Sequence, residues 1–416
     1  MLKLKAHDLE KVFLFFLLSL LFYSLFRGFP TDQGEIGLSA NILDIGDRPF
    51  YINQLNDDYG YSDYKGNLLY PSILIAIKRI CLLFSDNDAT SFLWNSIVIS
   101  ITSVLSFFIL RLLRVASNLI YGELVSFYAC LIYILNPYVY FYSLSGGITL
   151  YILFNVTFIL YIYALLYKYN NKNYKDKFKY YFCILFSCLA LSALRPTGGI
   201  FSIFVLTTIF IDIFNESIKF NNVRLIKLLS LSFFVIAIIF CIQNLIDVRA
   251  YINDNIIAFS NERGTFFGYP RELLRNNLSD IVVDNISFFK SSFLNVLIKC
   301  MEFVSGLSDI RDTHAGYKIK AVFPFLARIS TGLFYLYPLN LLSFLGIISN
   351  YRLIKSSKLW VVLVACFLAL SPSFLGYSNS RYLIMFFTPF ILFAAKLISD
   401  IIALSKNQLN NPYIND

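Results

Sequence analysis

Long runs of apolar residues alternate with short polar segments along most of this chain. The runs lack the polar stripe of an amphipathic helix, and most approach the roughly 20 residues that a helix needs to cross a bilayer. In order, the predicted spans cover residues 12–29, 92–113, 123–142, 148–167, 181–194, 199–214, 228–246, 329–349, 359–376 and 382–404. The predicted fold class is all-α, a polytopic integral membrane protein with about ten transmembrane helices.

One further apolar run, residues 71–84, has a different character. It is about 14 residues long and is interrupted by Lys78 and Arg79, so it is too short to cross a bilayer. We interpret it as an interfacial helix lying on the outer surface of the membrane. This choice sets the sidedness of everything that follows, because a true span here would reverse every later loop.

Positive charge marks the cytoplasmic side of the predicted bundle. The segment after the span 148–167 holds Lys168, Lys172, Lys175, Lys177 and Lys179. Since cytoplasmic loops are enriched in Lys and Arg, this cluster marks the cytoplasmic side, and the even number of predicted spans then places both chain ends in the cytoplasm. The predicted location is a bacterial inner (plasma) membrane.

The same assignment leaves two large segments on the outer face, both expected to contain interfacial helices. The predicted divisions are 1–30, the N-terminal tail and first span; 31–91, the first outer loop; 92–246, spans two to seven; 247–328, the second outer segment; and 329–416, spans eight to ten with a cytoplasmic tail. Any chemistry is expected in the two outer segments.

Composition agrees with a membrane protein. Of 416 residues, 57% are hydrophobic and 15% are charged, whereas soluble domains are about 25% charged. The net charge of +9 is explained by basic cytoplasmic loops, and no basic soluble face for nucleic acid is found. The sequence has neither a CxxC motif nor a Cys/His metal spacing.

The first outer segment is unusually acidic where the chain leaves the membrane. Residues 29–47 contain Asp32, Glu35, Asp44 and Asp47. A carboxylate at the membrane boundary can act as a general base on a hydroxyl group. Asp32 or Thr31 could equally cap a helix, with Glu35 at or near the capping-box spacing, and a residue at a helix N-terminus can do both.

Three arginines lie at the predicted outer ends of spans: Arg195, Arg328 and Arg381. A single arginine in such a position is commonly an interfacial anchor. Three around one outer face fit a site for a phosphate at headgroup depth, because a guanidinium binds phosphate oxygens through two parallel hydrogen bonds.

The order of these features resembles the GT-C superfamily of membrane glycosyltransferases, in particular the branch of protein O-mannosyltransferases and aminoarabinose transferases. The similarity begins with a span followed by Asp32, seven residues, Ala40, and then Gly46-Asp47. It continues through 65–71, Asn136-Pro137, 194–198, and Arg381-Tyr382 followed by Pro389. The family's second acid, aromatic residue and arginine in the first loop are replaced here by Gln33, Ile36 and Asn41.

This resemblance implies an inverting transfer of a sugar from a polyprenyl-phosphate-linked donor to an acceptor hydroxyl on the outer face. The acceptor would be a lipid, a glycan or a protein. The implied catalytic residues are Asp32 and Glu35, the donor-phosphate ligands are Arg195, Arg328 and Arg381, and the substrate-loop residues are Asp47, Lys65 and Tyr70. No cofactor is implied. A divalent metal is compatible with the resemblance, since some relatives need one and others do not, but the sequence does not indicate one.

Two other functions fit parts of the pattern. A Wzy-type polymerase of O-antigen or capsule polysaccharide also has large outer loops and functional outer arginines. A flippase or transporter for lipid-linked sugars is disfavoured, because the predicted spans carry few ionisable residues and no internal repeat. The acidic loop directly after the first span favours the glycosyltransferase.

Overall fold

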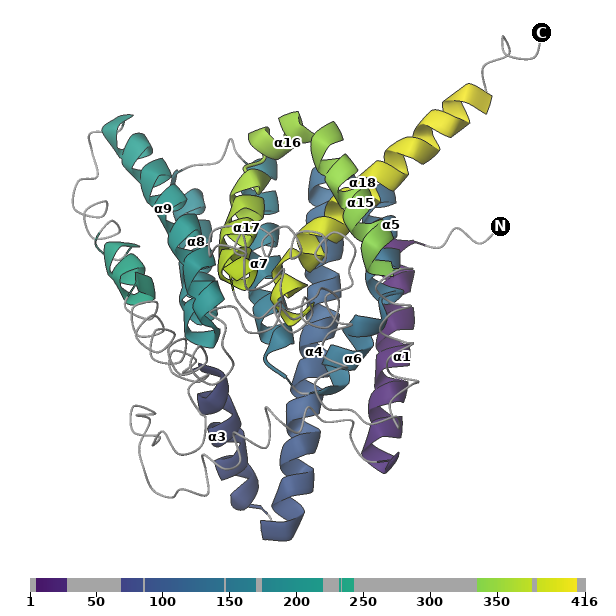
Figure 1. Cartoon of the computed structure of the whole chain (residues 1–416), viewed down its shortest axis with the longest axis vertical. Coiled ribbons are helices and arrows are strands. Elements are labelled where there is room, and N and C mark those ends of the chain that lie inside the picture. Colours follow the sequence, from purple (N-terminus) through teal and green to yellow (C-terminus); the bar gives the residue numbers. More distant parts are fainter. Residues whose placement is uncertain are drawn as a thin grey trace, which may run out of the picture.

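The structure, a computed structural model, describes residues 5–27, 69–84, 87–145, 147–169, 174–219, 232, 234–242, 335–375 and 380–409. Within these residues the regular elements are helical (Figure 1). The labelled helices are α1 (Ala6–Arg27), α3 (Leu69–Leu82), α4 (Asn87–Tyr121), α5 (Glu123–Ile134), α6 (Pro137–Ser145), α7 (Thr149–Lys168), α8 (Tyr174–Leu194), α9 (Pro196–Lys219), α15 (Tyr337–Ser349), α16 (Tyr351–Ser356), α17 (Leu359–Leu375) and α18 (Ser380–Leu409).

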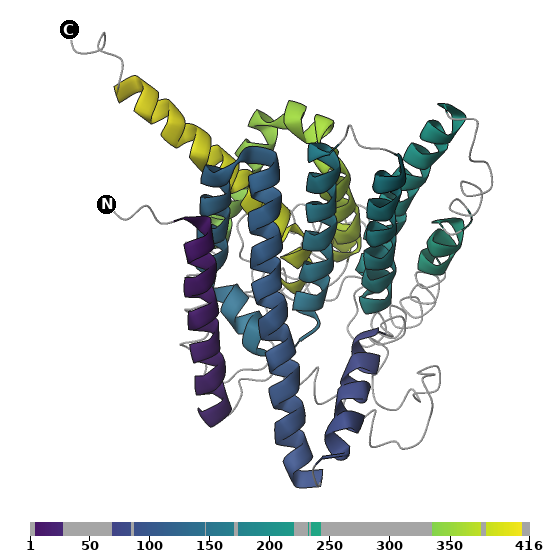
Figure 2. The same ribbon diagram turned by 180° about the vertical axis from the view of Figure 1, so that it is seen from behind.

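The helices form a bundle with two distinct ends. Helix α1 begins and α18 ends at the same end, which we call the termini end, and α1 ends at the opposite far end (Figures 1 and 2). Helix α4 runs toward the termini end, α5 away from it, α7 toward it, α8 away and α9 toward it. Successive long helices therefore alternate in direction.

Several helices are long and apolar enough to cross a membrane. They are Ser96–Tyr121, Thr149–Lys168, Lys177–Leu194, Thr197–Phe214 and Met385–Ser405, with shorter apolar helices at Tyr337–Ser349 and Leu359–Leu370. This is the composition of a multi-pass membrane protein. The described residues do not establish a count of ten spans, and most of the two predicted outer segments lies outside them.

The predicted span 123–142 is broken in the structure. It forms two helices, Glu123–Ile134 and Pro137–Leu144, which meet at 65°. Pro137 has no N–H to continue the helical hydrogen bonds, and the Asn136 side-chain oxygen accepts a hydrogen bond from the Tyr138 N–H at 2.9 Å. The proline therefore starts a new helix with an asparagine cap.

Helix α4 continues beyond the predicted end of its span at residue 113. It has 35 residues, about 52 Å of helix, and stops where Gly122 adopts a φ of 93°. Its Arg114 Nε lies 2.6 Å from Oε1 of Glu10 in α1, and Glu10 is 4% exposed. This partly buried ion pair joins the first helix to α4 near the termini end.

The middle of helix α18 is buried in the bundle, in contact with α5, α7, α15 and α17, whereas its C-terminal part projects beyond them (Figure 1). Residues 385–395 are all buried. Pro389 lies within the helix and cannot donate to the Met385 carbonyl four residues earlier. The Cys366 thiol of α17 donates to that carbonyl at 3.3 Å, so the carbonyl released by the proline keeps a partner.

Two further contacts position α15 and α7 against α18. The Ser343 hydroxyl donates to the Phe390 carbonyl at 2.7 Å, and the Thr157 hydroxyl of α7 donates to that of Thr388 at 3.0 Å. At Gly346 an added Cβ would lie 2.3 Å from the Phe393 carbonyl oxygen, so α15 approaches α18 at backbone distance. Small and hydroxyl side chains of this kind commonly join packed membrane helices.

Candidate functional site

The predicted site residues fall into three groups in the structure. Arg195 and Tyr70 are described with their side chains, whereas Arg381 belongs to the first turn of α18 and is described by its backbone alone. The others lie outside the described residues: Asp32, Glu35, Asp47, Lys65 and Arg328. That these residues lie close to Arg195 and Arg381 in one site remains a prediction.

Arg195 forms the whole turn between α8 and α9. Its N–H donates to the Leu191 carbonyl at 3.1 Å, and its own carbonyl accepts from the Gly199 N–H at 3.2 Å. The turn was expected to span 195–198, but α9 already begins at Pro196, because a proline needs no N–H partner in the first turn of a helix. Arg195 is thereby fixed at both sides of its backbone.

Close packing behind this turn fixes the hairpin. An added Cβ on Gly198 would lie 2.2 Å from the Leu191 carbonyl oxygen, so only glycine allows this approach. The Ser202 hydroxyl of α9 donates to the Cys188 carbonyl of α8 at 2.7 Å. The partly buried Arg195 side chain therefore starts from a rigid turn, and the α8–α9 hairpin points this turn toward the far end of the bundle (Figure 1).

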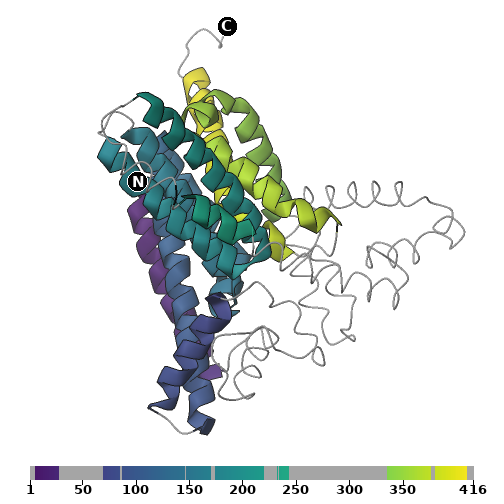
Figure 3. The ribbon, with the colours of Figure 1, turned by 90° about the vertical axis from the view of Figure 1, so that its left-hand side faces the viewer.

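Helix α3 reaches the same region and carries Tyr70. This helix and the first turns of α4 form a hairpin that extends from the far end, as Figure 3 shows. The Trp94 indole N–H donates to the Leu74 carbonyl at 3.1 Å and so joins the two helices. Tyr70, predicted in a substrate loop, lies in the first turn of α3 and is 1% exposed.

Tyr70 packs against Tyr151, in the first turn of α7. The ring centroids are 5.6 Å apart and the rings are inclined by 66°, an edge-to-face contact. The Tyr151 hydroxyl is buried and has no hydrogen-bond partner in the part of the chain that the structure describes. Sequence analysis did not single out Tyr151, because one tyrosine in an aromatic-rich helix gives no distinguishing pattern.

The described residues at the far end offer a positive charge and buried aromatic rings. A half-buried guanidinium such as that of Arg195 can stabilise a phosphate, whose charge is less screened there than in water. Among the residues described, no three His, Cys, Asp or Glu side chains are grouped as metal ligands would be.

Comparison with known proteins gives little that is close. No protein-family model matches this sequence, and no curated protein matches it. The structure is similar to that of the archaeal oligosaccharyltransferase AglB from Archaeoglobus fulgidus, solved with an inhibitory peptide and a dolichol-phosphate. The TM-score is 0.44 and the identity 13%, over 86% of this chain and 46% of that one. This chain thus spans less than half of AglB, and a likeness of this size establishes neither family nor function.

Proposed function

We propose that this protein is a membrane glycosyltransferase of the GT-C type, which transfers a sugar from a polyprenyl-phosphate-linked donor to an acceptor hydroxyl on the outer face of the membrane. The supporting observation is the one-residue turn between α8 and α9 that holds Arg195, because this turn faces the same end of the bundle toward which α1 runs (Figure 1). Asp32 follows Arg27, the last residue of α1, by five residues in the sequence.

In the proposed reaction Asp32 removes the proton from the acceptor hydroxyl. The oxygen attacks the anomeric carbon of the sugar while the bond to the donor phosphate oxygen breaks, and the polyprenyl phosphate leaves with the electron pair. Arg195, with Arg328 and Arg381, stabilises the charge on the departing phosphate. One displacement inverts the anomeric configuration, so a single carboxylate base is enough.

The remaining predicted residues are given supporting roles in the proposed site. Glu35 and Asp47 are proposed to assist Asp32, and Lys65 and Tyr70 to belong to the substrate loop. Because Tyr70 packs against Tyr151 in a buried contact, we assign Tyr70 a positioning role: it anchors α3 beside the start of α7. The proposed acceptor is a lipid, glycan or protein hydroxyl, and the proposed location is a bacterial plasma membrane.

Sugar transfer in membranes that contain Asp32→Asn tests the base. Asparagine keeps the size and much of the capping ability of aspartate but cannot accept the proton. We expect wild type to transfer radiolabelled sugar from a polyprenyl-phosphate donor, and Asp32→Asn to lose at least about 100-fold in rate, as removal of a general base does. Glu123→Gln, which removes an exposed carboxylate at the termini end, should retain activity.

Equal amounts of folded, inserted protein must be confirmed for each variant by size-exclusion chromatography. If Asp32→Asn transfers as well as wild type, Asp32 is only a helix cap. The polysaccharide polymerase with functional outer arginines then becomes the better interpretation, and elongation of diphosphate-linked repeats should be assayed.

Arg195→Gln tests the proposed phosphate site separately. Loss of one donor to a developing anion costs about 100-fold or more in rate, so transfer should fall by this amount. The control Arg111→Gln removes an exposed arginine from the C-terminal half of α4, which points toward the termini end, and should leave transfer unchanged. Equal activity of Arg195→Gln and wild type would reduce Arg195 to an interfacial anchor.

A further inference from the structure

A second candidate binding site lies at the termini end of the bundle, in the corner formed by α15, α16 and α17. Helix α15 runs toward this end, α16 turns the chain, and α17 runs back, so that α15 and α17 diverge below α16 (Figure 1). The corner contains a cavity of about 440 Å³ lined by Ile347, Tyr351, Ile354, Lys355 and Trp360.

The lining is apolar except at its rim. Ile354 is buried and Ile347 is partly buried, whereas the side chains of Tyr351, Lys355 and Trp360 are exposed. Below the corner the outward faces of α15 and α17 carry large exposed apolar residues: Leu341, Leu345, Ile348, Val364, Phe367 and Leu368. This is a surface that an acyl chain could cover, and Trp and Tyr are the side chains enriched at membrane interfaces.

Two cations lie at the same rim. In the described part of the chain Lys355 forms no ion pair with a carboxylate. Arg352 donates from Nε to the Tyr351 hydroxyl at 3.1 Å, and its guanidinium carbon is 5.8 Å from the Tyr351 ring centre. The aromatic ring therefore holds a second positive charge beside the cavity.

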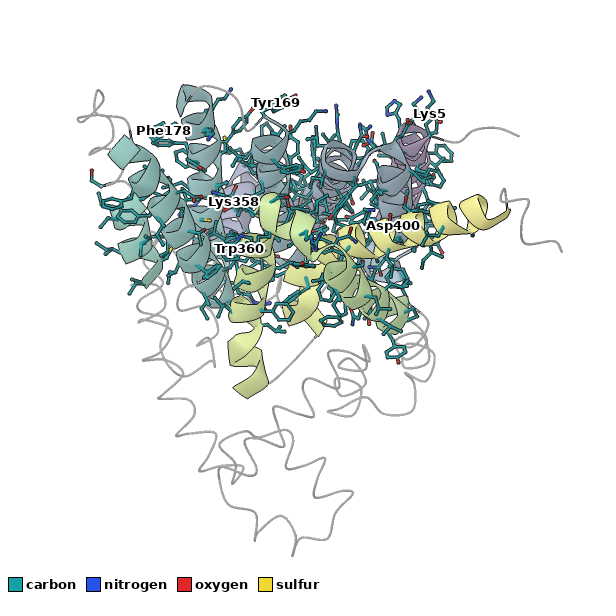
Figure 4. The ribbon with its side chains drawn as sticks, turned by 90° about the horizontal axis from the view of Figure 1, so that it is seen from above. Lys5, Tyr169, Phe178, Lys358, Trp360 and Asp400 are labelled. Carbon is teal, nitrogen blue, oxygen red and sulfur yellow. The ribbon has the colours of Figure 1, made fainter. Side chains whose placement is uncertain are left out.

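The neighbouring lysine is used differently. Lys358, labelled with Trp360 in Figure 4, pairs with Asp212 of α9 at 2.6 Å. That pair anchors the turn between α16 and α17 to the bundle. Lys355 lines the corner and Arg352 lies against Tyr351, and neither has a carboxylate partner among the described residues. The corner thus presents positive charge above an apolar cavity.

We propose that this corner binds one anionic phospholipid of the inner leaflet. Lys355 contacts the headgroup phosphate, Arg352 adds charge at the rim, and an acyl chain packs along Ile347 and Trp360. The net negative charge of this headgroup complements the two cations. A zwitterionic lipid has no net charge and is therefore expected to bind more weakly. The site involves other helices at the other end of the bundle, and its assignment to the inner leaflet rests on the same predicted sidedness as the proposed sugar transfer.

Binding of phosphatidylglycerol against phosphatidylcholine to the purified full-length protein tests this proposal. In native mass spectrometry from mixed micelles, wild type should retain one phosphatidylglycerol in preference to phosphatidylcholine. Lys355→Gln should weaken that preference about fivefold, the effect of one basic residue at an anionic surface. Lys168→Gln removes an exposed lysine from the same end, outside the cavity, and should change nothing.

A second variant and a soluble probe separate the lipid from other ligands. Ile347→Trp fills the cavity without a change in charge and should also reduce retention of the lipid. Inorganic phosphate at millimolar concentration should not displace it. The proposal is overturned if wild type shows no preference, if Lys355→Gln behaves as Lys168→Gln does, or if phosphate alone competes fully.

Discussion

At the scale of single residues, glycines and hydroxyls decide how closely the helices approach. Gly198 and Gly346 each lie against a carbonyl oxygen of a neighbouring helix, closer than any Cβ could approach. The sequence marked Gly198 as part of a turn, but nothing around Gly346 distinguishes it from another apolar helix position. Its role depends on a contact with Phe393, which is distant in the sequence, so pattern alone could not predict it.

Gly346→Ala should destabilise the protein markedly. The added methyl would lie 2.3 Å from the Phe393 carbonyl oxygen, which is backbone and cannot rotate away. Overpacking of this kind costs about 1–3 kcal/mol of unfolding free energy. Unfolding in detergent by increasing SDS should detect the loss. Leu345→Ala, on the exposed side of the same helix, serves as the control and should cost much less.

Tyr151→Phe should leave stability unchanged or raise it by up to about 1 kcal/mol, because the buried hydroxyl it removes has no partner in the described part of the chain. The ring contact with Tyr70 is kept. The matched variant Tyr133→Phe removes a buried hydroxyl that donates to the Ser106 carbonyl at 3.1 Å, and should cost about 1 kcal/mol. A clear loss of stability in Tyr151→Phe would mean that its hydroxyl has a partner elsewhere in the protein.

At the scale of helices, the apolar runs predicted where most elements lie, because length and hydropathy are properties of a single segment. The ends and breaks were less predictable. Helix α4 passes residue 113, since Arg114 finds a carboxylate on α1 and the helix ends only at Gly122. The break at Asn136-Pro137 depends on one side-chain cap, and the turn at Arg195 is shorter than expected because proline begins α9 directly.

The docking of α3 on α4 can be measured through Cys81. This side chain is 0% exposed, and burial raises the pKa of its thiol. Because the thiolate is the reactive form, both effects should make alkylation at pH 7.5 slower than for an exposed cysteine. Trp94→Phe removes the hydrogen bond to the Leu74 carbonyl and should accelerate alkylation of Cys81 several-fold, as followed by peptide mass spectrometry.

Ser100→Ala provides the control for this experiment. It removes a hydrogen bond to the Ser96 carbonyl within α4 itself and leaves the α3 contact intact. Cys81 should then react at the wild-type rate. Fast alkylation of Cys81 in the wild type would contradict a docked α3.

At the scale of the whole molecule, the predicted site depends on where non-helical chain meets the bundle. The sequence placed Arg195 at the end of a helix hairpin, and the structure has it there. It could not place Asp32 or Arg328 relative to Arg195, because segments without periodic apolar residues carry no register that fixes their contacts. The proposed site therefore requires that the far end of the bundle faces outward and the termini end faces the cytoplasm. Which side of the membrane each end faces can be measured directly.

Labelling of engineered cysteines from outside the cell tests that sidedness. Phe84 is 78% exposed and ends the α3 segment at the far end, whereas Lys168 is exposed at the close of α7. Between them the chain passes along α4, the bent pair α5–α6, and α7, each opposite in direction to the one before. If each of these three passes crosses the membrane, as predicted, the two positions lie on opposite sides of it.

With Cys300 replaced by serine, a membrane-impermeant maleimide should label Phe84→Cys in intact cells and Lys168→Cys only after permeabilisation. The basic residues around Lys168 give the direction, since they favour the cytoplasm. Labelling of both from outside would mean that the bent pair α5–α6 turns back without crossing. Labelling of Lys168→Cys alone would mean that α3 or α1 crosses differently, which would move Arg195 to the cytoplasmic side and exclude sugar transfer on the outer face.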